Sequence, residues 1–350
     1  MKKIEKKEFH NSNIEKVQKQ KGPFSFLVWI FKVEIIILII FLLINIIPDK
    51  VKFIAKYNIE KQFAHTINNN QNIDDFQNAL NNNKYLSEND REIINKFLKQ
   101  EIEENYNYID MKQCVQKIKS LKVIRKNEKY EIEKELNIAG SYSKLFNKID
   151  IYTNDDEMYF HELNHLISKN NLGSSFKIDL LSEIVNEHFS QEYINSSNAK
   201  GYEQYMFYSY VLAELLPEDI LRKYKFSDNE DILITALLEI DSNIDEVYRL
   251  ISSITLDGNY KNFRDSYEYF YEKKYNRKIE DDISVMIYLY NSPVVTDQER
   301  EKVKRYLELD DNDEIKKIIP KGYFSNEYKS EHKKIVIEYI KNDKEEMISI

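Results

Sequence analysis

The stretch His161-Glu162-Leu163-Asn164-His165 has the pattern H-E-x-x-H. It lies in a segment with the apolar periodicity of an amphipathic helix. Residues four apart share one face of a helix, so His161 and His165 can direct both imidazoles at one metal ion. Glu162 lies about 100° further round the helix, where it can hold a water molecule at the metal without being a ligand. The pattern therefore predicts a zinc site with a general base beside it.

The composition indicates a mostly helical protein. The 350 residues include only 6 Gly and 5 Pro, and 42% of them are hydrophobic, which favours long helices around a sizeable core. The chain has one cysteine, Cys114, so an intrachain disulfide and a cysteine-based metal site are excluded. The net charge of −9 argues against a nucleic-acid partner.

The N-terminal part has the composition of a membrane anchor. Residues 1–22 carry seven Lys and three Glu, a net charge of +4, and we expect them to form a cytoplasmic tail. Residues 23–47 contain an apolar run, 24–47, that we expect to cross the cell membrane once. A cleaved signal peptide is the alternative, but no small residues follow the apolar core as a cleavage site requires. The prediction is therefore an uncleaved anchor, with the C-terminal part outside the cell.

The remaining chain divides into a linker and an ectodomain. We interpret residues 48–75 as the linker and residues 76–350 as the ectodomain. Its N-terminal lobe would span 76–172 and carry the metal helix, and its C-terminal lobe would span 173–350. The C-terminal half is predicted to be a series of helices, of which the last covers residues 327–341.

Local patterns predict individual elements of the N-terminal lobe. Ser87 followed by Asp90 predicts a capped helix, and a second helix is expected over residues 111–121. Residues 129–132 and 147–152 alternate in the manner of strands. We hypothesise that residues 148–152 form an edge strand that pairs with an extended substrate backbone.

A third metal ligand is expected on a following helix, over residues 175–194. A catalytic zinc ion usually has three protein ligands and one open position. The metzincin pattern is excluded, because Ser168 and Asn171 stand where it requires a Gly and a third His. Glu183 and Glu187 are four residues apart and share a helix face. His188 is a weaker candidate, since it points about 100° away from Glu187.

The stretch Asn186-Glu187-His188-Phe189-Ser190 resembles the second motif of gluzincin metallopeptidases, the thermolysin-like clan, in which it follows H-E-x-x-H. The similarity covers residues 147–195 and extends to membrane-anchored gluzincin-like proteins of low-GC bacteria. It implies that His161, His165 and Glu187 bind Zn²⁺ and that Glu162 is the general base. Glu183 remains the alternative third ligand.

The chain departs from the gluzincin pattern in the support of its histidines. Gln191 stands where the family usually has an acid that bonds to a ligand His. A neutral amide would orient the imidazole but polarise it less. Asn186 is the other candidate for such a supporting role.

The resemblance implies a fold and an activity. The fold would be α+β and mostly α: a zincin-like catalytic domain with a small β-sheet before the H-E-x-x-H helix and a helical C-terminal lobe, preceded by one transmembrane helix. The activity would be hydrolysis of peptide bonds in a peptide or protein substrate. The alternative is a catalytically inactive gluzincin-like domain that serves as a binding module at the cell surface.

Overall fold

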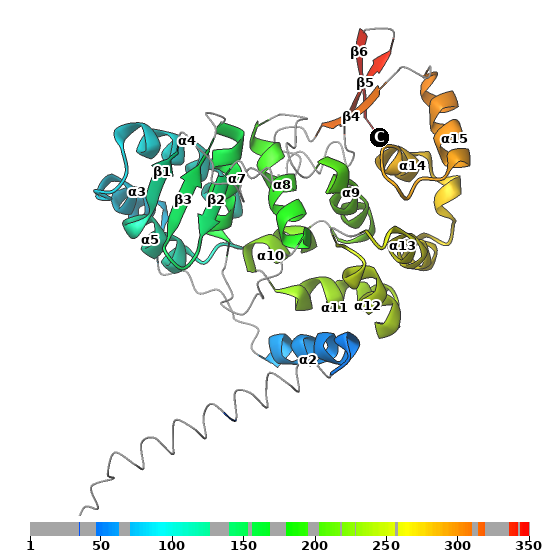
Figure 1. Ribbon diagram of the computed structural model, residues 1–350, viewed down its shortest axis with the longest axis horizontal. Coiled ribbons are helices and arrows are strands. Elements are labelled where there is room, and N and C mark those ends of the chain that lie inside the picture. Colours follow the sequence, from blue (N-terminus) through cyan, green and yellow to red (C-terminus); the bar gives the residue numbers. More distant parts are fainter. Residues whose placement is uncertain are drawn as a thin grey trace, which may run out of the picture. The chain divides into compact units, whose positions relative to one another are not determined.

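The computed structural model describes residues 35, 47–62, 71–126, 140–152, 156–168, 180–194, 203–217, 219–227, 229–255, 258–309, 314–318, 336–341 and 344–349. These residues form a mostly helical α+β fold with two small three-stranded sheets (Figure 1). The chain divides into two compact units, Met1–Ala55 and Lys56–Ile350. The candidate metal centre and the surfaces discussed below belong to the second unit.

The predicted membrane anchor lies almost entirely outside the described residues, as does the predicted tail 1–22. In the part that is described, no helix has the length and apolar character needed to cross a membrane. Within the predicted linker, 48–75, a helix is present: α2 (Asp49–Gln62).

The predicted helices of the N-terminal lobe are confirmed. They are α4 (Glu88–Asn105) and α5 (Met111–Ser120), preceded by α3 (Ile73–Asn81). The Ser87 hydroxyl accepts a hydrogen bond from the Asp90 N–H and caps α4, as expected. Buried apolar residues of these three helices pack with Ile149 and Leu163 in one core, which supports the helix that carries H-E-x-x-H.

The first sheet contains β1 (Lys122–Arg125), β2 (Gly140–Ser143) and β3 (Lys148–Ile151). The predicted strand over 147–152 is confirmed as β3, but its predicted place at an edge is wrong. The strand order is β1-β3-β2, with β3 parallel to β1 and antiparallel to β2. Ile149, Asp150 and Ile151 are all buried, as expected of a strand with neighbours on both sides. The predicted strand 129–132 lies outside the described residues.

The motif helix is α7 (Asp156–Ile167), and it packs against β2 and against α8 (Leu180–Ile194). Helices continue through the C-terminal half as predicted up to residue 307. They are η1 (Glu203–Tyr205), α9 (Met206–Leu215), α10 (Ile220–Ser227), α11 (Glu230–Ile240), α12 (Ile244–Ser252), α13 (Tyr260–Tyr275), η2 (Ile279–Asp281), α14 (Ile283–Leu289) and α15 (Asp297–Leu307).

The start of α15 is held by a buried carboxylate. Thr296 and Glu299 form a capping box, in which each side chain bonds the backbone N–H of the other residue. Arg264 on α13 donates to both oxygens of Glu299, at 2.6 and 3.2 Å. A paired and hydrogen-bonded carboxylate therefore joins α13 to α15.

The C-terminal segment forms a second sheet of β4 (Glu314–Ile318), β5 (Val336–Lys341) and β6 (Lys344–Ser349), all antiparallel in the order β4-β5-β6. The predicted helix over 327–341 is therefore wrong at residues 336–341. A short apolar run is compatible with a strand as well as with a helix. Residues 336–341 form a strand because they pair with both β4 and β6. Residues 327–335 lie outside the described part.

Candidate metal centre

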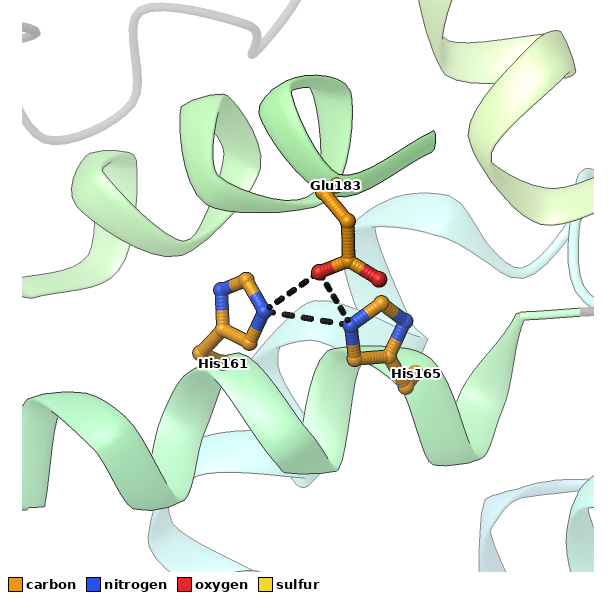
Figure 2. A group of neighbouring side chains, drawn as sticks. All are labelled: His161, His165 and Glu183. Carbon is orange, nitrogen blue, oxygen red and sulfur yellow. Dashed lines mark hydrogen bonds and ion pairs between the residues drawn. The ribbon is translucent and has the colours of Figure 1, made fainter. Parts of the chain in front are cut away.

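Three donor atoms from two helices converge on one point (Figure 2). His161 and His165 lie one turn apart on α7, and Glu183 reaches them from α8. The two Nε2 atoms are 3.1 Å apart, and Glu183 Oε2 lies 3.2 Å from each of them. Among the described residues, these three form a group that could hold a metal ion.

The size of this triangle fits a zinc ion. Zinc binds imidazole nitrogen and carboxylate oxygen at about 2.0–2.1 Å, so two ligands of a tetrahedral site lie roughly 3.3 Å apart. The observed separations of 3.1 and 3.2 Å are close to that value. Two His and one Glu also leave a fourth coordination position for water, as catalytic zinc sites do.

Glu187 lies on the other side of the His161 ring. Its Oε2 atom is 2.7 Å from His161 Nδ1. A proton on Nδ1, donated to this carboxylate, leaves the lone pair of Nε2 available for a metal. The geometry thus favours Glu183 as the third ligand and Glu187 as the carboxylate that orients His161. This order is the reverse of the one that the gluzincin resemblance implies.

The electrostatics of the cluster favour the charged forms of His161 and Glu183. Burial alone would lower the pKa of His161, but its bonds to Glu183 and Glu187 hold that pKa well above the usual value. Burial alone would raise the pKa of Glu183, but His165 and His161 hold it well below its usual value. His161 is buried, whereas His165 and Glu183 are partly exposed, so the cluster is open to solvent on their side.

Glu162 lies beside the triangle without belonging to it. Its side chain is buried, and burial raises its pKa, while His161 and His165 act in the opposite direction. The backbone N–H of Tyr142 on β2 donates to its carboxylate. A Cβ atom at Gly140 would lie 3.1 Å from both Cγ and Oε1 of Glu162. The backbone of β2 therefore forms a wall against the predicted general base.

Asn186 supports the backbone of α7 rather than an imidazole ring. Its Nδ2 donates to the carbonyl oxygen of His161 at 2.9 Å. One turn further, Asn164 Nδ2 donates to Ser190 Oγ at 2.7 Å, and Ser190 Oγ donates to the Asn186 carbonyl at 2.9 Å. These bonds connect α7 to α8. Gln191 also lies on α8, but its side chain is outside the described part.

His188 takes no part in the triangle. Its Nδ1 atom lies 2.8 Å from Ser209 Oγ on α9, and the ring is buried. The weakest of the three predicted third ligands thus contacts another helix.

A buried ion pair lies behind the motif helix. Lys225 on α10 bonds both Glu101 on α4 and the Oδ1 atom of Asn164 in the motif. The side chains of Lys225 and Glu101 are 1% and 0% exposed. The Lys225 ammonium also lies 4.8 and 4.6 Å from the ring centroids of Phe189 and Phe226. Four helices therefore meet at one charged contact that no sequence pattern predicted.

The signal for this contact in the sequence is weak. Lys225 stands between Tyr224 and Phe226 in a short amphipathic helix, where a lysine is ordinarily solvated. Its partner Glu101 lies 124 residues earlier. Only the polar Asn164, on the buried side of the motif helix, indicates that a polar partner is needed there.

We compared the chain with protein-family models, with curated proteins and with solved structures, and none of them matches it.

Proposed function

We propose that this protein is a gluzincin-type zinc metallopeptidase in which His161, His165 and Glu183 bind the metal and Glu162 is the general base. The observation that carries the proposal is the triangle of two Nε2 atoms and one carboxylate oxygen, with sides of 3.1–3.2 Å, beside a buried glutamate. Glu187 supports the proposal because its Oε2 atom lies 2.7 Å from His161 Nδ1, where it can accept the Nδ1 proton and leave Nε2 to the metal.

The chemistry of the site follows from its residues. A zinc ion, when bound, lowers the pKa of a water molecule and polarises the scissile carbonyl group. The Glu162 carboxylate accepts a proton from the attacking water and passes it to the nitrogen of the departing amine. The new C–O bond forms first, and the C–N bond breaks once the nitrogen has received the proton, so one water is consumed for each peptide bond. The Tyr142 N–H holds the carboxylate in place through this transfer.

The edge at which a peptide would pair is that of β2. Among the described residues, β2 is the outer strand next to α7, with its other side paired to β3. An extended peptide that adds to this edge by β-augmentation would lie beside Glu162. This arrangement supports an extended peptide or protein segment as the substrate. The strand proposed to pair with the substrate backbone is therefore residues 140–143 instead of residues 148–152.

The location of the protein is part of the same proposal. The basic tail of residues 1–22 and the apolar run of residues 24–47 support a single-pass anchor in the cell membrane, with the catalytic domain outside. A C-terminal tag that external protease removes from intact cells would support this orientation, whereas a fully protected tag would contradict it.

The variant Glu162→Gln tests the proposed activity. We expect the purified full chain to contain about one zinc per molecule and to cleave members of a peptide library, as followed by mass spectrometry. The variant should retain zinc and lose roughly 10²–10⁴-fold in cleavage rate, because the general base is lost. Glu103→Gln, a change at an exposed glutamate on α4, is the matched control and should cleave like the wild type.

Two results would contradict the proposal. If Glu162→Gln cleaves as fast as the wild type, Glu162 is not the base. If the wild-type chain holds zinc that His161→Ala loses, but cleaves no peptide, the inactive binding module is the better explanation.

A further inference from the structure

Three segments of the N-terminal lobe meet at the C-terminal end of α5, and we call them the lysine tip: residues 83–86, 117–122 and 143–148. Asn83 Nδ2 donates to the carbonyl oxygens of Ile118 and Leu121, at 2.7 and 2.9 Å. Asn147 Nδ2 donates to the Lys117 carbonyl oxygen at 2.6 Å. These bonds hold the turn between β2 and β3 against the end of α5, next to the sheet (Figure 1).

Large apolar side chains are exposed at this tip. Leu145 is 83% exposed and Phe146 is 69% exposed, and both lie in the turn between β2 and β3. Tyr85 is 51% exposed in the neighbouring segment, and Ile124 on the adjoining β1 is also exposed. Eight large hydrophobic residues are exposed in the described part of the chain, and these four are half of them. Such a concentration of exposed apolar surface marks a contact site.

The same segments are strongly basic. They contain six lysines and no Asp or Glu, in a chain whose net charge is −9. Four of the lysines are exposed: Lys84, Lys119, Lys122 and Lys144. The ammonium groups of Lys84 and Lys122 lie 5.6 and 5.1 Å from the centroid of the Tyr85 ring. Aromatic and basic groups are therefore presented together.

We propose that the lysine tip inserts Leu145 and Phe146 into the surface of an anionic lipid bilayer, with the exposed lysines against the lipid phosphates. Apolar insertion and electrostatic attraction to anionic lipid each bind a membrane weakly, and a surface that supplies both binds it stably. A turn that projects two adjacent apolar side chains suits the acyl boundary of a bilayer, which has no fixed shape to match. This contact involves neither the metal ligands nor the predicted anchor.

The contact also has a consequence for the metal centre. The strand β2 runs from Gly140, beside Glu162, directly into the turn that carries Leu145. Five residues of extended chain span at most roughly 17 Å. Insertion of the tip would thus hold the metal centre within a short distance of the membrane surface.

The tip can be tested in the full chain with one fluorescent label. Leu145→Cys is labelled with an environment-sensitive fluorophore and reconstituted into vesicles of phosphatidylcholine, with or without phosphatidylglycerol. Cys114 does not compete for the label, because it is buried and burial raises the pKa of its thiol to about 12. Tyr306→Cys on α15, where the side chain is 60% exposed, is the matched control.

We expect the label at 145 to shift to shorter wavelength and to be quenched by brominated lipids in the anionic vesicles. The label at 306 should show neither effect. The charge reversal Lys119→Glu with Lys144→Glu should reduce the response at 145 to its level in phosphatidylcholine. The proposal is overturned if the label at 145 responds equally in both kinds of vesicle, if it responds in neither, or if the label at 306 responds as strongly. An acidic protein partner would give the second of these results.

Discussion

The buried pair of Lys225 and Glu101 makes a prediction that can be worked out from the structure. Replacing Lys225 with Met keeps most of the side-chain volume but leaves the Glu101 carboxyl without its counter-charge, in a place where it is 0% exposed. Removing one partner of a buried ion pair costs about 3–5 kcal/mol. The variant should therefore lose that amount from its free energy of unfolding.

A double variant separates the charge from the packing. When Glu101 is also replaced with Met, no buried charge remains, and such replacements are often neutral or stabilising. Asn164 still lacks the donor that Lys225 supplied, which costs about 1 kcal/mol. We expect the double variant to lie within about 2 kcal/mol of the wild type and thus to be more stable than Lys225→Met alone.

Equilibrium urea unfolding of the full chain, followed by circular dichroism in the presence of a chelator, measures these values. Lys223→Met is the matched control, because Lys223 lies on the same helix, bonds Asp219 at the surface and is 44% exposed. An exposed pair of this kind contributes at most about 1 kcal/mol. The prediction is wrong if Lys225→Met costs no more stability than Lys223→Met, or if the double variant is no more stable than Lys225→Met.

Three further predictions follow from the site and from the capping box. Glu183→Gln should weaken zinc binding more than Glu187→Gln, for which we expect a roughly 10–100-fold loss of zinc affinity. Competition with a chromophoric chelator measures both affinities. If Glu187→Gln loses more affinity than Glu183→Gln, Glu187 is the ligand. Gly140→Ala should slow peptide cleavage without loss of zinc, because its Cβ displaces Glu162; wild-type kinetics would contradict this. Burial would raise the pKa of Glu299, but its bonds with arginine hold that pKa below 4.5. The stability that Glu299 contributes is thus present above pH 4.5 and lost on acidification. The difference in melting temperature between the wild type and Glu299→Gln should therefore be large at pH 7 and shrink below pH 4.5. A difference that does not change with pH would contradict this prediction.

Much of the helical part of the fold could be predicted because its signals are local. Ser87 caps α4 as its spacing from Asp90 indicates, and the helices of the C-terminal half follow their apolar periodicity. The strands were harder to predict, because the position of a strand in a sheet depends on the strands that pair with it. The pattern of residues 147–152 identified β3 but not its central position, which depends on β1 and β2. For the same reason, residues 336–341 were predicted as helix and form β5.

The sequence by itself determined the core of the candidate metal centre. His161 and His165 share a face because the spacing of four residues closely matches one turn of a helix, and Glu162 follows from the same geometry. Glu183 and Glu187 were also found as a pair, because they too are four residues apart. Local periodicity is thus sufficient to place donors on each helix separately.

Only the tertiary structure decided how those donors meet. Both glutamates share one face of α8, so the position of α8 against α7 determines which carboxylate reaches the two Nε2 atoms and which reaches Nδ1 of His161. The pair of Lys225 and Glu101 likewise depends on contact between two helices, because the two residues are 124 positions apart in the sequence. Such contacts are selected by the packing of the whole core, and no local pattern in the sequence specifies them.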